Sequence, residues 1–238
     1  MKVTALLTGR GNNTLPDKNV REILGHPVLH YPALAGREAK EVSAWYCSSD
    51  DEKILEAAEK EGYKRIVRPE ELARPDSQHI DCIMHALGIM EQQGNLPDVL
   101  VVLLANNVTV YSQWIDDCVQ LLKQHPEASS VVPVYQDNDH HPLRAKSLSA
   151  DGYLRMYEKQ DAATVSTNRQ DLPKCMFLAH NFWVLRTSVI RAPGGQPPWT
   201  FMGDTILPYM IDRSIDIHDE LDLYIAKAWL EMESHARK

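Results

Sequence analysis

The chain has 238 residues, a formal net charge of −8 and 44% hydrophobic residues. This length and composition predict one large folded domain, or a domain with a small appendage, and argue against a disordered chain. The acidic excess opposes general nucleic-acid binding, because the phosphates of a nucleic acid would be repelled. No apolar run approaches the ~20 residues that a membrane-spanning helix needs. We therefore expect neither nucleic acid nor membrane among the partners of this protein.

The four cysteines favour a reducing compartment. They are widely spaced, form no CxxC pair, and three of them lie in apolar stretches. This usage is typical of reduced thiols in a core and not of disulfides or a zinc site. Met1 and Lys2 lead directly into a strand-like run without a signal-type cleavage site. We therefore expect a cytoplasmic protein.

Short apolar runs alternate with amphipathic stretches through the first half of the chain. Strands are expected at residues 2–7, 42–47, 65–67, 98–104 and 129–135. Four helices are expected. The first covers 27–39, and the second follows an acidic cap at 49–52. The third is capped by Ser77 and runs to about residue 93, and the fourth is capped by Ser112. The run 98–104, which is continuously apolar after Asp98, is typical of a strand buried on both faces of a parallel sheet. The alternation predicts an α/β fold with a mostly parallel sheet flanked by helices, and ligands at the carboxyl ends of the strands.

This alternation is lost from residue 136 to about 177, where charged and polar residues and two prolines interrupt the apolar runs. Such a stretch is either a flexible insertion or an arm that orders against a partner, and we favour the arm. A strand at 182–189, a loop at 194–199, a short strand at 215–217 and a final helix capped by Asp219 follow. We see no repeat and no second domain. The prediction is a single domain, 1–238, with an insertion at 136–180.

The loop after the first strand, TGRGNNTLPDKN at residues 8–19, combines small turn-forming residues with two cations. Glycine and asparagine allow backbone amides to converge on an anion, and Arg10 and Lys18 add positive charge. The loop lacks the spacing of the Walker loop and of the dinucleotide fingerprint. A phosphate site and an ordinary surface turn both remain open, and a nucleotide is the first candidate ligand.

The C-terminal motif SIDIHDELDL gathers acidic residues and a histidine at a predicted strand-to-helix junction. If residues 215–217 form a strand, alternation places Asp216 and His218 on the same side, where they could share one metal ion. Asp219 can instead be a simple helix N-cap. Both interpretations remain open.

Further charged residues lie in the irregular middle and at predicted strand ends. Arg144 and Arg169 suit a carboxylate ligand because each guanidinium offers a fixed fork of donors, but either can be a surface charge. Asp50 and Arg68 follow the second and third predicted strands, on the expected binding edge. Both can equally be structural.

Six motifs in order, RG-x4-LPDKN, SSD, RPEELA, HHPLR, RQDLP and SIDIHDELDL, resemble the acylneuraminate cytidylyltransferases, also called CMP-sialic acid synthetases. Pseudaminate, legionaminate and KDO enzymes are relatives of that family, and HHPLR favours the sialate-like branch. The resemblance covers roughly residues 3–230. It implies a Rossmann-like nucleotidyltransferase fold and the transfer of CMP from CTP to a nonulosonic acid with release of pyrophosphate. It also implies Mg²⁺, with Mn²⁺ as an alternative, and a homodimer in which the middle segment reaches the partner's active site.

The resemblance also implies roles for individual residues. Those expected to act in catalysis are Arg10, Lys18 and Asp216. Those expected to bind the nucleotide are Arg10, Gly11, Asn12, Asn13, Lys18, Asn19 and Arg68. Those expected to bind the sugar acid are Arg144, Arg169 and Gln170, and the expected metal ligands are Asp216, His218 and Asp219.

Several departures from the family pattern weaken the expected site. The opening loop is one residue shorter than RGGSKRLPGKN, and Asn12, Asn13 and Thr14 replace glycine, serine and lysine, so fewer charges face the triphosphate. The usual QPTSPLR reads LANNVTV at 104–110. A second sugar-facing arginine has no counterpart near Phe177.

The family's DIDT reads Asp216-Ile217-His218-Asp219, and imidazole is a poor ligand for magnesium. Three outcomes remain open: Asp219 substitutes as ligand, the metal preference changes, or His218 acts as a base for the sugar hydroxyl. Two alternative functions also remain. One is nucleotidyl transfer to another sugar or alditol phosphate, and the other is a catalytically impaired homologue that binds nucleotide.

Overall fold

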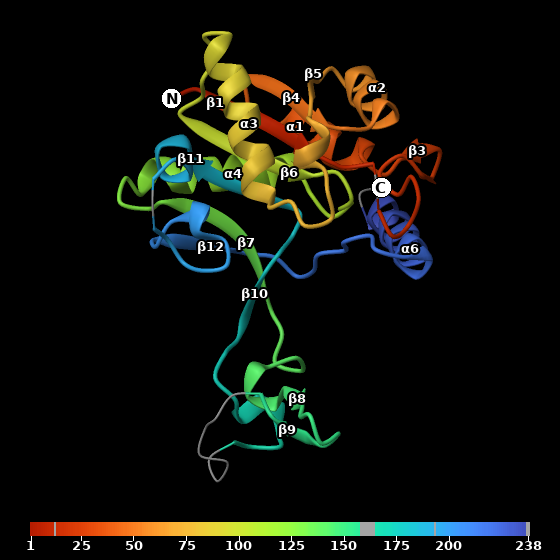
Figure 1. Cartoon of the computed structure of the whole chain (residues 1–238), viewed down its shortest axis with the longest axis vertical. Helices are drawn as coiled ribbons and strands as arrows, with labels where there is room; N and C mark the ends of the chain where they lie inside the picture. The colour runs from red at the N-terminus through yellow and green to blue at the C-terminus, as the bar shows by residue number, and fades with distance from the viewer. Residues whose placement is uncertain (12, 158–164, 193, 237–238) are drawn as a thin grey trace.

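The computed structural model describes residues 1–11, 13–157, 165–192 and 194–236, and its centre is a twisted sheet (Figure 1). Along the sheet the strands are ordered β10-β7-β11-β6-β1-β4-β5, with β12 also paired to β7. Their bounds are β1 (Val3–Thr8), β4 (Ala44–Ser49), β5 (Lys64–Val67), β6 (Val99–Leu104), β7 (Ser130–Gln136), β10 (Met176–Leu178), β11 (Phe182–Arg186) and β12 (Ile206–Met210). Strands β5, β4, β1 and β6 are parallel, whereas β11 is antiparallel to β6 and β7. The predicted α/β fold with a mostly parallel sheet is confirmed.

Helices cover both faces of this sheet. They are α1 (His30–Glu38), α2 (Glu52–Lys60), α3 (His79–Gln92), α4 (Ser112–Gln124), α5 (Thr187–Ile190) and α6 (Glu220–Ala236). Strand β1 is buried throughout, because alternate side chains enter two different cores. Val3, Ala5 and Leu7 pack with α1, α2 and α4, while Leu6 packs with α3 on the opposite face. The resulting three-layer arrangement leaves the carboxyl ends of the parallel strands free to form a site.

Several local predictions were wrong. The strand expected at 182–189 ends at Arg186 and is followed directly by α5. The helix expected at 27–39 begins only at His30, because Pro27 belongs to a short hairpin formed by β2 (Glu22–Ile23) and β3 (His26–Pro27). Ser77 does not cap α3, since its hydroxyl donates to the carbonyl of Glu71 at 2.8 Å. Ser112 is the first residue of α4 and not its cap. Strand β12 was not predicted at all.

The segment between β7 and β10 projects away from the body of the protein (Figure 1). It carries a small antiparallel pair, β8 (Lys146–Leu148) and β9 (Leu154–Met156). Large apolar side chains on this pair and in its connecting turn are exposed, namely Leu148 at 74%, Tyr153 at 64% and Leu154 at 67%. A two-stranded pair is only marginally stable in water. The segment has the form of the predicted arm, and the dimer remains a prediction.

The C-terminal part of the chain returns to the opening loop. Buried Ile215 and Ile217 pack with Leu15, Val28 and Ala226 of α6 in a third apolar cluster. The strand expected at 215–217 is a single antiparallel bridge between Asn107 and Asp216. This packing brings the acidic motif beside the loop that follows β1, although about 200 residues separate them along the chain.

The cysteines are free, and Cys47, Cys82 and Cys118 are buried. Burial raises the pKa of the Cys47 thiol to about 12, so it stays protonated in the core. Among the helices described here, none combines the length and the apolar character required to cross a membrane.

Candidate active site

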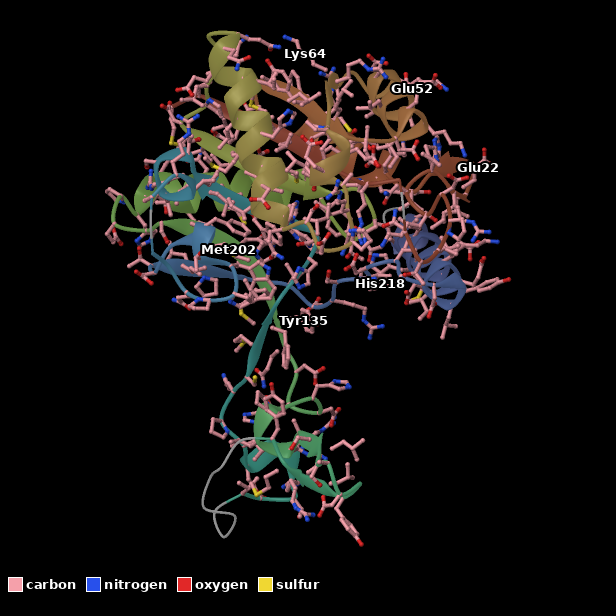
Figure 2. The ribbon with its side chains drawn as sticks, in the orientation of Figure 1. Glu22, Glu52, Lys64, Tyr135, Met202 and His218 are labelled. Atoms are coloured by element: carbon pink, nitrogen blue, oxygen red, sulfur yellow. The ribbon has the colours of Figure 1, made fainter. Side chains whose placement is uncertain are left out.

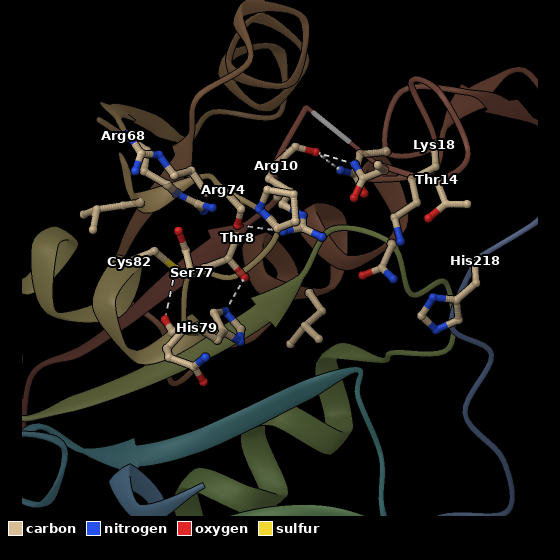
Figure 3. A pocket seen from close by; sticks show the side chains of 18 of the residues that line it. Thr8, Arg10, Thr14, Lys18, Arg68, Arg74, Ser77, His79, Cys82 and His218 are labelled. Atoms are coloured by element: carbon tan, nitrogen blue, oxygen red, sulfur yellow. Dashed lines mark hydrogen bonds between the residues drawn. The ribbon is translucent and has the colours of Figure 1, made fainter. Parts of the chain in front are cut away.

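A cleft of about 640 Å³ opens where β1, β5 and β6 end (Figure 3). Parallel α/β sheets commonly bind ligands at this edge. The cleft brings together the predicted nucleotide-binding residues Arg10, Asn13, Lys18, Asn19 and Arg68, and also His218 and Asp219. Asn12 lies outside the residues that the structure describes. Much of the predicted site therefore lies in one place, although its members come from distant segments.

Two asparagines hold the opening loop in shape. The side-chain amides of Asn13 and Asn19 donate to the carbonyl of Arg10 at 2.5 and 3.1 Å. Asn19 is only 3% exposed, so its amide gains little from water and depends on this bond. The predicted nucleotide-binding asparagines thus also organise the backbone that carries Arg10.

Gly11 is required by a close approach between the loop and α2. A Cβ at this position would lie 2.5 Å from a carboxylate oxygen of Asp51, the N-cap of α2. The Gly11 amide donates to Asp50 Oδ1 at 3.1 Å. The Gly11 amide is therefore already hydrogen-bonded to a carboxylate. Recognition of a phosphate depends more on the two cations of the loop than on this amide.

Arg10 and Lys18 are near opposite ends of the loop, and both line the cleft. The Arg10 guanidinium donates to the carbonyl of Arg74 at 3.0 Å, and Lys18 Nζ donates to the carbonyl of Ile217 at 2.9 Å. Burial lowers the pKa of Lys18, and Asp216 opposes this shift while Arg10 adds to it. Both cations are anchored by carbonyl oxygens and retain further N–H groups for a ligand.

Arg68 directly follows β5, is 7% exposed, and is held by its contacts with the neighbouring strand β4. Its Nε donates to Ser48 Oγ at 3.2 Å, and its terminal nitrogen donates to the Ser48 carbonyl at 2.7 Å. The guanidinium also lines the cleft. Arg68 is therefore both structural and in reach of a ligand, which reconciles the two interpretations left open by the sequence.

The C-terminal motif places Asp216 and His218 on the same side, as alternation predicts. His218 Nε2 lies 3.0 Å from Asp216 Oδ2, and the amide of Asn106 donates to Asp216 Oδ1. Burial raises the pKa of Asp216, while His218 and Lys18 oppose that shift. His218 and Asn106 line the cleft directly. The carboxylate of Asp216 therefore supports two side chains that face a ligand.

Asp219 caps α6. Its Oδ1 accepts from the backbone amides of Leu221 and Asp222 at 2.8 and 3.1 Å. This contact is the arrangement of a helix N-cap, and it supports the structural interpretation of this residue. Asp219 nevertheless lines the cleft.

The motif does not build a protein-only metal cage. Within the described ranges, no three His, Cys, Asp or Glu side chains are grouped to hold a metal ion. Both oxygens of Asp216 are engaged by side-chain nitrogens, and one oxygen of Asp219 is used in the helix cap. Imidazole of His218 is unsuited to magnesium. A magnesium ion here would take most of its ligands from bound phosphate groups and water.

The three residues predicted to bind the sugar acid are not brought to this cleft. Arg144 and Arg169 lie in the arm, and both face Asp139, at 3.7 Å and 2.5 Å from its carboxylate oxygens. Gln170 lies in the adjoining turn, where its backbone amide donates to Asn168 Oδ1 at 3.2 Å. Figure 2 shows the arm extending beyond Tyr135, away from the body that contains His218.

His79 is a cleft residue that sequence reasoning missed. Its Nε2 lies 3.0 Å from Thr8 Oγ1, and its ring packs 5.2 Å from the ring of Trp183. Burial lowers the pKa of His79 to about 4, and the nearby Arg68 and His180 add to the effect. The sequence offered no local signal for this contact, because Thr8 and His79 are separated by 71 residues.

Comparison with known proteins agrees with this geometry at the family level. The sequence profile described as Cytidylyltransferase matches residues 10–174. Curated relatives include the 8-amino-3,8-dideoxy-manno-octulosonate cytidylyltransferases of Shewanella amazonensis and Shewanella woodyi. Each is 28% identical over 127 residues, covering 53% of this chain and 49% of the relative. The match therefore spans about half the length of these curated relatives.

Solved structures share the fold. The CMP:2-keto-3-deoxy-manno-octonic acid synthetase complexed with CTP has a TM-score of 0.70 at 13% identity, covering 98% of this chain and 100% of the other. The 4-diphosphocytidyl-2C-methyl-D-erythritol synthase from Anaerococcus prevotii has a TM-score of 0.63 at 12% identity, covering 97% and 96%. At such identities the likeness concerns the fold. Because the profile match covers more than half of the sequence and includes the opening loop, Arg68 and the arm, the chain belongs to the cytidylyltransferase family.

Proposed function

We propose that this protein transfers CMP from CTP to the anomeric hydroxyl of a 2-keto-3-deoxy sugar acid and releases pyrophosphate. The observation that carries the proposal is the grouping of Arg10, Lys18 and Arg68 in one cleft at the carboxyl ends of the parallel strands. Fixed cations at such an edge suit a triphosphate and its developing charge. Membership of the cytidylyltransferase family makes CTP the first nucleotide to test.

In the proposed reaction, the sugar hydroxyl oxygen bonds to the α-phosphorus of CTP. The bond from that phosphorus to the oxygen bridging to the β-phosphate breaks, and pyrophosphate leaves with the electron pair. Arg10 and Lys18 stabilise the charge on the leaving group. His218 accepts the proton of the sugar hydroxyl, and Asp216 orients the imidazole through their 3.0 Å contact. This assignment follows the third outcome that the altered DIDT motif left open.

The proposed cofactor is a Mg²⁺ ion that accompanies the triphosphate. Magnesium in nucleotide sites is commonly held by one or two carboxylates together with phosphates and water. Asp216 is the carboxylate assigned to this role by the resemblance, although both of its oxygens have other partners in the structure. When bound, the ion would neutralise charge on the triphosphate. Because His218 is adjacent, Mn²⁺ is included as an alternative.

The acceptor proposed first is a sialate-type nonulosonic acid, which the order of the six motifs and the HHPLR element support. A second candidate is an octulosonate acid, because the two Shewanella relatives carry that substrate in their names. Both acids present a carboxylate next to the anomeric hydroxyl. Arg144 and Arg169 already converge on the carboxylate of Asp139, so this pair can accommodate such a group.

We also propose a homodimer in which the arm of one copy approaches the cleft of the other. Two features support it: the arm projects from the body (Figure 1), and it exposes Leu148, Tyr153 and Leu154. Leu148→Asp is expected to shift a dimer to a monomer in light scattering and to lower sugar-acid turnover while CTP binding remains. Met232→Asp is the control, since Met232 is also exposed, at 68%, but lies on α6. A wild-type monomer with full activity would refute this arrangement.

The activity is tested by incubating the purified chain with CTP, a panel of nonulosonic and octulosonic acids, and Mg²⁺, Mn²⁺ or a chelator. Pyrophosphate release and CMP-sugar formation are measured. Arg10→Ala is expected to weaken CTP binding, and Asp216→Ala to abolish turnover. CTP binding without product for any acid would overturn the proposed enzyme and leave a nucleotide-binding homologue. Product with only one class of acid decides between the two acceptors.

A further inference from the structure

The end of the cleft opposite Lys18 and His218 contains a histidine whose contacts define its tautomer (Figure 3). Thr8 Oγ1 lies 3.2 Å from the carbonyl oxygen of Leu103 and 3.0 Å from His79 Nε2. A carbonyl can only accept, so the single hydroxyl proton of Thr8 is donated to Leu103. The oxygen of Thr8 then accepts from His79, and the proton of the neutral imidazole must be on Nε2. His79 Nδ1 is left as an acceptor.

This acceptor has no partner among the described residues. The hydrogen-bond contact of the imidazole within the described ranges is made by Nε2, and His79 lines the cleft. An atom without a partner is either enclosed by protein or open to solvent. Nδ1 is not one of the enclosed polar atoms, so it is accessible to solvent. Trp183 packs against the ring and restricts its rotation. The geometry therefore presents a fixed hydrogen-bond acceptor to a ligand.

The ring remains neutral at neutral pH. Burial lowers the pKa of His79 to about 4, and the charged Arg68 and the imidazole of His180 act in the same direction. A neutral imidazole offers one donor and one acceptor, whereas a protonated one offers two donors. The unpaired nitrogen thus keeps its acceptor character in the conditions under which a nucleotide would bind.

We propose that His79 selects cytosine by accepting a hydrogen bond from its exocyclic amino group, and that Thr8 is the positioning residue that sets the tautomer. This inference rests on the proposed function, because it takes a cytidine nucleotide as the ligand. The cations Arg10 and Lys18 direct the triphosphate toward the other part of the cleft, while Leu72 and Cys82 add apolar surface to its lining, and the Cys82 thiol contacts the His79 carbonyl. Uracil has a carbonyl oxygen in place of the amino group, so two acceptors would face each other.

The test compares CTP and UTP binding by calorimetry at neutral pH. The wild-type protein is expected to prefer CTP by about 10- to 100-fold, the ratio that one well-placed polar contact in a buried site provides. Thr8→Val keeps the side-chain shape but removes the hydroxyl, and it is expected to reduce the preference to less than about threefold by weakening CTP binding. Thr8→Ser, which retains the hydroxyl, should preserve the preference. His79→Phe should abolish it.

The outcomes separate this inference from the proposed function. No CTP binding by the wild-type protein would overturn both. A wild-type preference for CTP that Thr8→Val and His79→Phe leave unchanged would overturn the inference alone, as would equal losses of CTP and UTP. If His79→Phe fails to fold, Thr8→Val still decides. Nitrogen-15 NMR of the free protein gives an independent readout: the Nε2–H tautomer of His79 is expected, and the Nδ1–H tautomer would refute the role of Thr8.

Discussion

Replacement of Lys18 by methionine tests whether the opening loop is a triphosphate site. Lys18 Nζ donates to the carbonyl of Ile217 at 2.9 Å and lies in the same cleft as Arg10. Methionine keeps an unbranched apolar chain and removes the ammonium group. The substitution therefore removes one charge from the cleft with little change in packing.

The expected size of the effect follows from the contacts. A hydrogen bond between a charged donor and a phosphate contributes about 1.5–3 kcal/mol, so CTP should bind about 10- to 150-fold more weakly. The loss in stability should be small. One hydrogen bond to Ile217 disappears, at about 1 kcal/mol, but the burial that lowers the pKa of Lys18 also opposes its charged form. We expect the melting temperature to fall by no more than about 4 °C.

Calorimetric titration with CTP, together with thermal melting, measures both quantities. Lys53→Met is the matched control: Lys53 pairs with Asp17 in the same loop at 2.8 Å, but its side chain is 64% exposed. The control removes the same charge outside the cleft, so CTP binding should change by less than about threefold. Equal losses in the two variants would show that only net charge matters. An unchanged affinity in Lys18→Met would refute the assignment of Lys18.

Two further predictions concern stability. Asp219→Ala removes the N-cap of α6 and should destabilise the protein by about 1 kcal/mol, whereas Asp219→Asn should not. Thermal melting measures this, and a large loss of Mg²⁺-dependent turnover in Asp219→Asn would instead indicate a metal ligand. For His79, the pKa falls from its ordinary value of 6.5 to about 4 on folding, so below 6.5 the unfolded chain binds more protons. The contribution of the neutral His79 to the free energy of unfolding is complete above about pH 6.5 and is lost as the pH falls toward 4. The expected loss is about 1–3 kcal/mol, reduced for solvent access through the cleft. Urea unfolding across this range should show a shallower pH slope in His79→Phe, and identical slopes would contradict the burial of the ring.

Much of the fold could be predicted because its signals are local. Residues 99–104 are all apolar, and the structure buries them as β6 in the middle of the sheet, between the parallel strand β1 and the antiparallel strand β11. Asp51 follows a strand and precedes an amphipathic helix, and it caps α2 through the amides of Lys53 and Ile54. Hydrophobic patterns and helix caps of this kind are determined by residues that are close together in the sequence.

Strand β12 could not be predicted in the same way. Pro208 lies within it and removes a backbone donor, which argues against a strand in a sequence. The strand forms because it pairs in parallel with β7, where Leu207 lies opposite Val131. Likewise, Ser77 has the residue type of a helix cap, but its hydroxyl finds the carbonyl of Glu71. In each case a contact that the local pattern does not specify overrides the local preference.

The sequence by itself determined the α/β architecture, the cationic loop after β1 and the order of motifs that points to a cytidylyltransferase. Only the tertiary structure decided how those parts meet. It attached Asp216 to both Asn106 and His218, kept Arg144 and Arg169 in a projecting arm, and paired Thr8 with His79. The physical reason is that strand and helix patterns arise from neighbouring residues. A cleft at the edge of a sheet is formed by side chains from segments whose proximity depends on the packing of the whole chain.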